Sequence, residues 1–197
     1  MKQAGTHVGA VWLRDVLRQV GSRRPQALLD ELGDSLLARA MHPASAQRGG
    51  EAYAAANEAL FALTQVGSRG PWGGGQPYAG ASDRLITMHR TAPSLFIRKK
   101  SLGALLATPD HARAVDYLTQ VAESSDSTAY DAIYFLVGDA NGGSWTATTP
   151  SASEQRESGA ALRALGARGR VTDGRAATML EMWISRNSPA PPLDSRQ

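Results

Sequence analysis

The residue types that most often act as general bases or metal ligands are few in this chain. It has four histidines, and no two of them stand three or four positions apart, as a metal-binding helix would need. We interpret His42, His89 and His111 as scattered surface or packing residues, and His7 lies near the N-terminus. Cysteine is absent, which excludes disulfides, thiolate metal sites and thiol nucleophiles.

Other motifs begin like known functional sequences but do not complete them. The segment 139–143 starts like a calcium-binding loop, yet Pro150 stands where the closing glutamate is needed. The glycines at 73–75 are followed by no Gly-Lys-Ser or Gly-Lys-Thr sequence, and no Gly-x-Ser-x-Gly elbow is present. The sequence therefore predicts a protein that is not an enzyme and that uses no cofactor or metal ion.

Large aromatic residues stand in two glycine-rich segments, at about 67–81 and 139–150, which we expect to be loops. Trp72 and Tyr78 lie in the first segment, and Trp145 lies in the second. Aromatic residues dominate the hot spots of protein interfaces, so these side chains are candidate anchors for a partner. The alternative, that each loop folds back and buries its tryptophan as a plug, stays equally open.

Basic residues form two clusters, one within 90–100 and one within 163–175. Arg98, Lys99 and Lys100 belong to the first cluster and are candidate partner-binding residues. A concave surface carrying both clusters would hold the backbone of a nucleic acid. The net charge is only +3, although the isoelectric point is about 9.5, so charge alone does not argue for that ligand.

The segment 110–131 between the two basic clusters is mainly acidic and would interrupt a continuous basic stripe. We interpret its carboxylate pairs, Asp110 with Asp116 and Asp126 with Asp131, as solvated helix faces. Nucleic-acid binding is therefore the second hypothesis rather than the first.

Apolar residues recur at helical spacing along most of the chain, whereas strand-like alternation is scarce, which predicts an all-α protein. Ser151 and Glu154 form a capping box, and the proline-containing tail 188–197 is expected to be disordered. The helices are expected at 8–20, 25–41, 51–66, from 82 or 83 through 88, 94–107, 111–123, from the turn at 124–126 to 138, 151–167, and from 172 or 173 onward.

A five-residue pattern, small–large–any–variable–leucine, recurs within the expected helices. Small residues allow helices to approach closely, and large ones fill the space between them, so stacked helix hairpins explain the repetition. An irregular helical bundle, in which alanine and leucine are merely good helix formers, is the alternative. The pattern begins at Ala59, Ser101, Ala132 and Ala161.

This pattern resembles the second helix of HEAT repeats, best over 93–105, where Ile97-Arg98 stands at the family's Val-Arg pair. The resemblance implies that Arg98 bonds within the ladder of repeats, which favours a structural role. The next unit has an aspartate, Asp126, in its turn, but Ala129 stands where the arginine would be.

The resemblance implies a right-handed α-solenoid of about four helix hairpins, forming one domain over 1–187. Its expected function is non-catalytic: a scaffold or assembly subunit that binds another protein through its concave face and its tryptophan-bearing loops. Since no run approaches the roughly 18 apolar residues of a membrane helix, membrane insertion is not expected. A cytoplasmic location is the default expectation, with export after signal removal left open.

Overall fold

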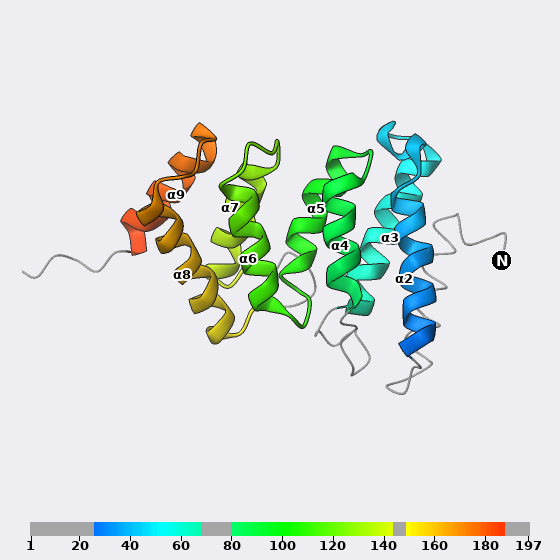
Figure 1. Cartoon of the computed structure of the whole chain (residues 1–197), viewed down its shortest axis with the longest axis horizontal. Coiled ribbons are helices and arrows are strands. Elements are labelled where there is room, and N and C mark those ends of the chain that lie inside the picture. Colours follow the sequence, from blue (N-terminus) through cyan, green and yellow to red (C-terminus); the bar gives the residue numbers. More distant parts are fainter. Residues whose placement is uncertain (1–25, 68–79, 144–148, 188–197) are drawn as a thin grey trace, which may run out of the picture.

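The structure is a computed structural model that describes residues 26–67, 80–143 and 149–187. All regular structure within these ranges is helical, without a strand, as Figure 1 shows. The predicted all-α class is confirmed. The helix expected at 8–20 and the tail 188–197 lie outside the described residues.

The described helices correspond closely to the predicted ones. In chain order they are α2 (Gln26–Ala40), the short 3-10 helix η1 (Pro43–Ala46), α3 (Glu51–Gly67), α4 (Gly80–Thr91), α5 (Leu95–Leu105), α6 (His111–Ala122), α7 (Ala129–Ala140), α8 (Ala152–Arg168) and α9 (Gly174–Asn187).

The helices are arranged in two layers. In the layer that we call the second layer, α3 contacts α5, α5 contacts α7, and α7 contacts α9. In the first layer, α2 contacts α4 and α6 contacts α8. Each first-layer helix also packs against the helix that follows it in the chain. Figure 1 shows the resulting row, from α2 and α3 at the right to α8 and α9 at the left.

Local capping signals explain where several helices begin. The side chains of Ser94 and Asp110 accept hydrogen bonds from backbone N–H groups in the first turns of α5 and α6. The predicted capping box of Ser151 and Glu154 is present at the start of α8. Asp173 accepts a hydrogen bond from a backbone N–H at the start of α9, as expected for a cap. Short-range chemistry therefore fixes these boundaries.

The start of α4 differs from the prediction. The helix begins at Gly80, before the predicted start at 82 or 83, so Ser82 and Asp83 lie inside its first turn and do not cap it. Ser82 is buried inside the first turn, where its hydroxyl donates to Oγ1 of Thr108 at 3.0 Å. Asp83 forms an ion pair with Arg113 of α6. Ser82 therefore contacts the turn between α5 and α6, and Asp83 connects α4 to α6.

The end of α7 also differs from the prediction, which places it at Gly138. The helix continues through Ala140, and Gly142, which follows the C-cap Asn141, has a φ of +74°, a left-handed conformation that favours glycine. The N–H of Gly143 donates to the carbonyl oxygen of Gly138 at 2.8 Å, as in a Schellman motif. Asp139, expected in a loop, therefore lies in the helix and is buried.

The five-residue pattern contributes to the core. Three of its occurrences lie in the second layer, on α3, α5 and α7, whereas the fourth lies on the first-layer helix α8. A Cβ atom at Gly103, within the pattern on α5, would lie 2.5 Å from Cε1 of Phe135 on α7. Glycine thus permits the close approach of these helices. The large second residue of each occurrence is buried: Leu60, Leu102, Ile133 and Leu162.

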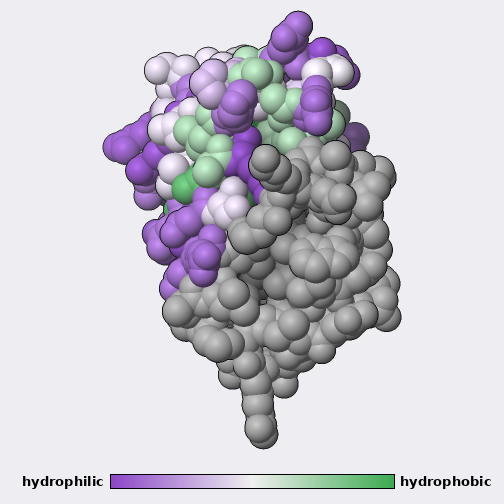
Figure 2. Space-filling view, turned by 90° about the vertical axis from the view of Figure 1, so that its right-hand side faces the viewer, coloured by the Kyte–Doolittle hydropathy of each residue, from purple (hydrophilic) through white to green (hydrophobic). Residues whose placement is uncertain are grey.

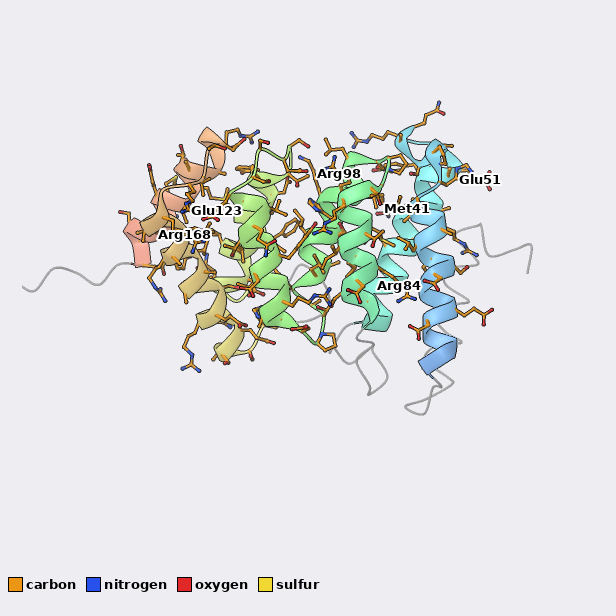
Figure 3. The ribbon with its side chains drawn as sticks, in the orientation of Figure 1. Met41, Glu51, Arg84, Arg98, Glu123 and Arg168 are labelled. Atoms are coloured by element: carbon orange, nitrogen blue, oxygen red, sulfur yellow. The ribbon has the colours of Figure 1, made fainter. Side chains whose placement is uncertain are left out.

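An arginine from α4 connects the first two helix pairs at the α2 end of the molecule. Nη2 of Arg84, which is labelled in Figure 3, donates to Oδ1 of Asp34 at 2.7 Å and to the carbonyl oxygen of Asp30 at 3.0 Å. Gly33 makes room for this guanidinium, because a Cβ there would lie 2.6 Å from Nε. Figure 2 views this end and shows hydrophobic residues interspersed with hydrophilic ones over its coloured part.

Candidate functional site

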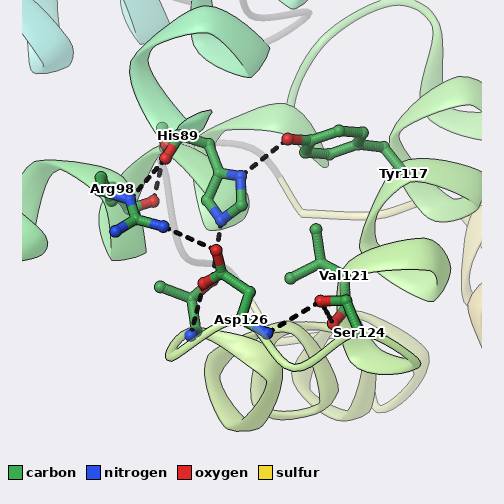
Figure 4. Close-up of polar contacts among 8 residues, drawn as sticks. His89, Arg98, Tyr117, Val121, Ser124 and Asp126 are labelled. Carbon is green, nitrogen blue, oxygen red and sulfur yellow. Dashed lines mark hydrogen bonds and ion pairs between the residues drawn. The ribbon is translucent and has the colours of Figure 1, made fainter. Parts of the chain in front are cut away.

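Buried polar side chains gather where the α4–α5 pair meets the α6–α7 pair. Nδ1 of His89 lies 2.7 Å from the hydroxyl of Tyr117, and Nε2 lies 2.7 Å from Oγ1 of Thr128 (Figure 4). The Thr128 hydroxyl donates to Oδ1 of Asp126 at 2.6 Å. Because the single hydroxyl proton of Thr128 goes to Asp126, Nε2 of His89 donates to Thr128, and in a neutral imidazole Nδ1 then accepts from the hydroxyl of Tyr117. This network contains a neutral imidazole.

The electrostatics of the site agree with that assignment. His89 is 3% exposed, and burial lowers its pKa below the ordinary value. The positive charges of Arg98 and Arg90 lower the pKa further, and the combined effect outweighs the opposite effect of Asp126. Burial also raises the pKa of the Tyr117 hydroxyl, which stays protonated and able to donate.

Arg98 closes this network from α5. Its Nε donates to the carbonyl oxygen of His89 at 2.7 Å, and its Nη2 donates to Oδ2 of Asp126 at 2.7 Å (Figure 4). Burial raises the pKa of Asp126, but hydrogen bonds from Thr128 and the charge of Arg98 outweigh it and lower the pKa. Arg98 therefore joins the end of α4 to the turn before α7, which agrees with the structural role that the HEAT resemblance implies.

A second buried network lies where α6, α7 and α8 meet. Nε2 of His111 lies 3.0 Å from Oδ2 of Asp139, and Nδ1 lies 2.6 Å from Oε2 of Glu157. The hydroxyl of Ser158 donates to the same Asp139 oxygen at 2.6 Å. Since both imidazole nitrogens face carboxylates, which only accept, the geometry requires both to carry protons. Burial lowers the pKa of His111, but Asp139 and Glu157 outweigh it and raise the pKa above its ordinary value.

The residues of the His111 network are those of acid–base chemistry, but their arrangement favours a structural role. The Ser158 hydroxyl donates to Asp139, whereas an activated nucleophile would face the imidazole. His111 is 4% exposed and Ser158 is fully buried, so a substrate has no access to either side chain. We interpret both histidine networks as connections between neighbouring helices.

The exposed surface of the second layer carries a different set of residues. The described large hydrophobic residues that stay exposed all lie on its helices, and Phe96 of α5 and Tyr134 of α7 are 36% and 39% exposed. Two further residues share this property, namely Leu95 and Met182. Because the described first-layer helices contribute none, the two layers have surfaces of different character.

Contacts to aromatic rings join α3 with α5 and α7 with α9 on this surface. The ring centroids of Phe96 and of Tyr53 on α3 lie 5.6 Å apart. Nζ of Lys100 lies 5.7 Å from the ring centroid of Phe96. On α7, the rings of Tyr130 and Tyr134 stack at 6.4 Å. We call these side chains, together with Arg175 of α9, the aromatic strip: Tyr53, Phe96, Lys100, Tyr130, Tyr134 and Arg175.

Positive charges accompany the aromatic rings. The guanidinium carbon of Arg175 lies 4.5 Å from the ring centroid of Tyr130, which is a cation–π distance. Lys99 forms an ion pair with Asp131 at 3.1 Å and so connects α5 to α7 beside the strip. Oδ2 of Asp131 is buried and accepts no hydrogen bond within the described residues, so Lys99 compensates its charge.

The predicted partner-binding residues lie in different environments. Lys100 is exposed on the aromatic strip, Lys99 is ion-paired beside it, and Arg98 is hydrogen-bonded within the His89 network. Trp72, Tyr78 and Trp145 lie outside the described residues. Sequence reasoning does not single out Phe96 or Tyr134; for Phe96, an aromatic residue on a helix rich in basic side chains is the available signal.

The interpretation of Asp126 and Asp131 as solvated is wrong, because both form ion pairs with the first basic cluster. Glu123, also in the acidic segment, pairs with Arg168 of the second cluster, and Figure 3 shows these two side chains together. The acidic segment therefore compensates charges in both basic clusters.

The geometry of the described residues was also compared with metal sites, membrane-spanning helices and known proteins. Among the described residues, no group of three or more histidine, aspartate and glutamate side chains is placed to hold a metal ion. None of the described helices is long and apolar enough to cross a membrane. No family model, no curated protein and no solved structure matches this chain.

Proposed function

We propose that this protein is a non-catalytic scaffold that binds another protein through the exposed face of its second layer. The aromatic strip is the observation that carries the proposal. It combines exposed phenylalanine and tyrosine with lysine and arginine, and aromatic residues and arginine are enriched in protein interfaces. An exposed set of this kind is a candidate recognition surface.

We propose further that the helices form a HEAT-like α-solenoid of about four hairpins. The contacts of each second-layer helix with the next support this arrangement, as does the bonding of Arg98 between repeats. In such a solenoid the second helices line the concave face, where an extended partner would contact several repeats at once. The tryptophan-bearing loops, with Trp72, Tyr78 and Trp145, are proposed to extend this contact.

Three residues of the basic clusters are already ion-paired, which favours a protein partner over a nucleic acid. Arg98, Lys99 and Arg168 each have a carboxylate partner inside the molecule. A nucleic acid needs several cations free to meet successive phosphates, and each paired cation would first have to leave its carboxylate.

Affinity purification from the native host, compared between the wild-type chain and a Phe96→Ala/Tyr134→Ala variant, tests the proposal. A partner that is recovered with the wild type and lost with the variant is the expected result. Gln120→Ala on α6 changes an exposed first-layer residue and is the matched control, which should retain the partner. Circular dichroism checks that helical content is unchanged.

The proposal is contradicted if every protein recovered with the wild type is recovered equally with the variant. Trp72→Ala and Trp145→Ala test the loops separately, and each should weaken recovery of the same partner. Retention of DNA or RNA that falls steeply as salt rises would instead support the nucleic-acid hypothesis.

A further inference from the structure

We infer that the aromatic strip binds an acidic segment of its partner, one in which carboxylates alternate with apolar or aromatic residues. This inference rests on the proposed function and adds the chemistry of the ligand to it. Two properties of the strip carry it: the excess of positive charge on its surface and the placement of each cation beside an aromatic ring.

The charge excess follows from the ion pairs. Lys99 of α5 and Asp131 of α7 form an ion pair, so the carboxylate of Asp131 is not available as a partner for other cations. Within the described residues, Lys100 and Arg175 contact aromatic rings rather than carboxylates. Both side chains are exposed, on the two second-layer helices that pack against α7. A ligand that covers this surface is favoured when it supplies negative charge.

The exposed rings require that the ligand also supply apolar side chains. Phe96 and Tyr134 present apolar surface on the same strip as these cations, and carboxylates alone would leave that surface uncovered. A segment that places an apolar side chain on a ring and a carboxylate on a cation satisfies both groups. Since the cations lie on α5 and α9 and the rings lie on α5 and α7, the segment must cross the helices rather than follow one of them.

A polynucleotide matches the strip less well. Its phosphates are evenly spaced, whereas the strip offers cations on α5 and α9 separated by the tyrosines of α7. Stacking of bases on the exposed rings is the feature that the two ligand classes share, and the experiment must therefore separate them.

Selection from a random dodecapeptide phage library on the wild-type protein tests the inference, with a Lys100→Glu/Arg175→Glu variant as the counter-selection. We expect enriched peptides that combine aspartate or glutamate with aromatic or aliphatic residues. A synthetic, fluorescein-labelled copy of one such peptide should bind the variant about tenfold more weakly by fluorescence anisotropy. Arg156→Glu, an exposed charge reversal on α8, is the matched control and should bind like the wild type.

Each other outcome overturns the inference. Enrichment of neutral or basic peptides does so, as does equal binding of the acidic peptide to both charge variants. Tighter binding of a labelled oligo-dT of matched length, sensitive to the same substitutions, would assign the strip to nucleic acid instead. If selected peptides are not acidic but still require Phe96, the proposed function stands and only this inference fails. If no selected peptide depends on any strip residue, both fail.

Discussion

His89 and His111 are both almost completely buried, and each joins one pair of helices to the next. Their pKa values are nevertheless shifted in opposite directions. His89 lies between two hydroxyl groups, so burial determines its pKa, which is lowered. His111 lies between two carboxylates, which outweigh burial and raise its pKa. Burial alone therefore does not determine the charge of an interior histidine, because its hydrogen-bond partners decide which effect is larger.

The two helix junctions also differ in which residue carries their positive charge. The neutral imidazole of His89 continues a chain of hydrogen bonds from Tyr117 to Asp126, and the positive charge of that region belongs to Arg98. At the other junction the imidazolium is itself the cation. One junction thus has a permanent cation, whereas the other depends on a proton and hence on pH.

Among the substitutions at the two junctions, removal of the Asp139 carboxylate should have the largest effect on the free energy of unfolding. Asp139→Asn leaves the buried His111 with Glu157 as its only carboxylate partner and weakens the bond from Ser158. We expect a loss of about 3 kcal/mol in the free energy of unfolding, as is typical when one member of a buried charged pair is removed. Urea unfolding at mildly acidic pH measures it.

Asp116→Asn is the matched control for that substitution, because Asp116 is an exposed carboxylate on α6. It should change the free energy of unfolding by less than about 0.5 kcal/mol. Equal effects of the two substitutions would show that the buried carboxylate has no special role in stability.

The pH dependence of stability should differ in sign between the two histidines. The pKa of His111 is raised above 6.5, so its stabilising contribution is complete below pH 6.5 and is lost as pH rises through the folded-state pKa. The pKa of His89 is lowered below 6.5, so its contribution is complete above pH 6.5 and is lost as pH falls through the folded-state pKa. Urea unfolding across this pH range measures the two opposite slopes.

NMR titration of the imidazole C2 protons checks this prediction directly. His111 should titrate above pH 6.5 and His89 below it. In Asp139→Asn, the pKa of His111 should fall while that of His89 stays where it was. Titration of both residues on the same side of 6.5 would refute the opposite pKa shifts.

The smallest effect is expected at the neutral junction. Tyr117→Phe removes the hydroxyl that donates to Nδ1 of His89 and leaves that buried nitrogen without this donor. We expect a loss of about 1 kcal/mol in the free energy of unfolding, together with a rise in the pKa of His89. Tyr53→Phe, at a half-buried ring on α3, is the control in the same unfolding assay and should be close to neutral.

The sequence predicts the helices well because their boundaries depend on neighbouring residues. Ser94, Asp110 and the Ser151–Glu154 box each act within one turn, so their spacing in the sequence is sufficient. The predicted end of α7 is too early because Gly138 has the residue type of a helix terminator but lies within the helix. The left-handed Gly142 ends the helix instead.

The sites depend on contacts that no local pattern contains. His111 and Asp139 are 28 residues apart, and Arg98 and Asp126 are likewise 28 residues apart. The relative register of packed helices brings these residues together, and single-sequence periodicity does not encode that register. The structural role predicted for Arg98 rests on a resemblance rather than on a local pattern, and its bonds to His89 and Asp126 agree with that role.

The close approach at Gly103 has a consequence for recognition. Gly103 meets Phe135 between α5 and α7, the two helices that carry the exposed rings Phe96 and Tyr134. The distance between α5 and α7, and with it the separation of the two rings, therefore depends on the absence of a side chain at Gly103. A side chain at this position would act as a wedge and widen the footprint that a ligand must cover. The width of the proposed recognition surface is thus influenced by a glycine that lies between the helices.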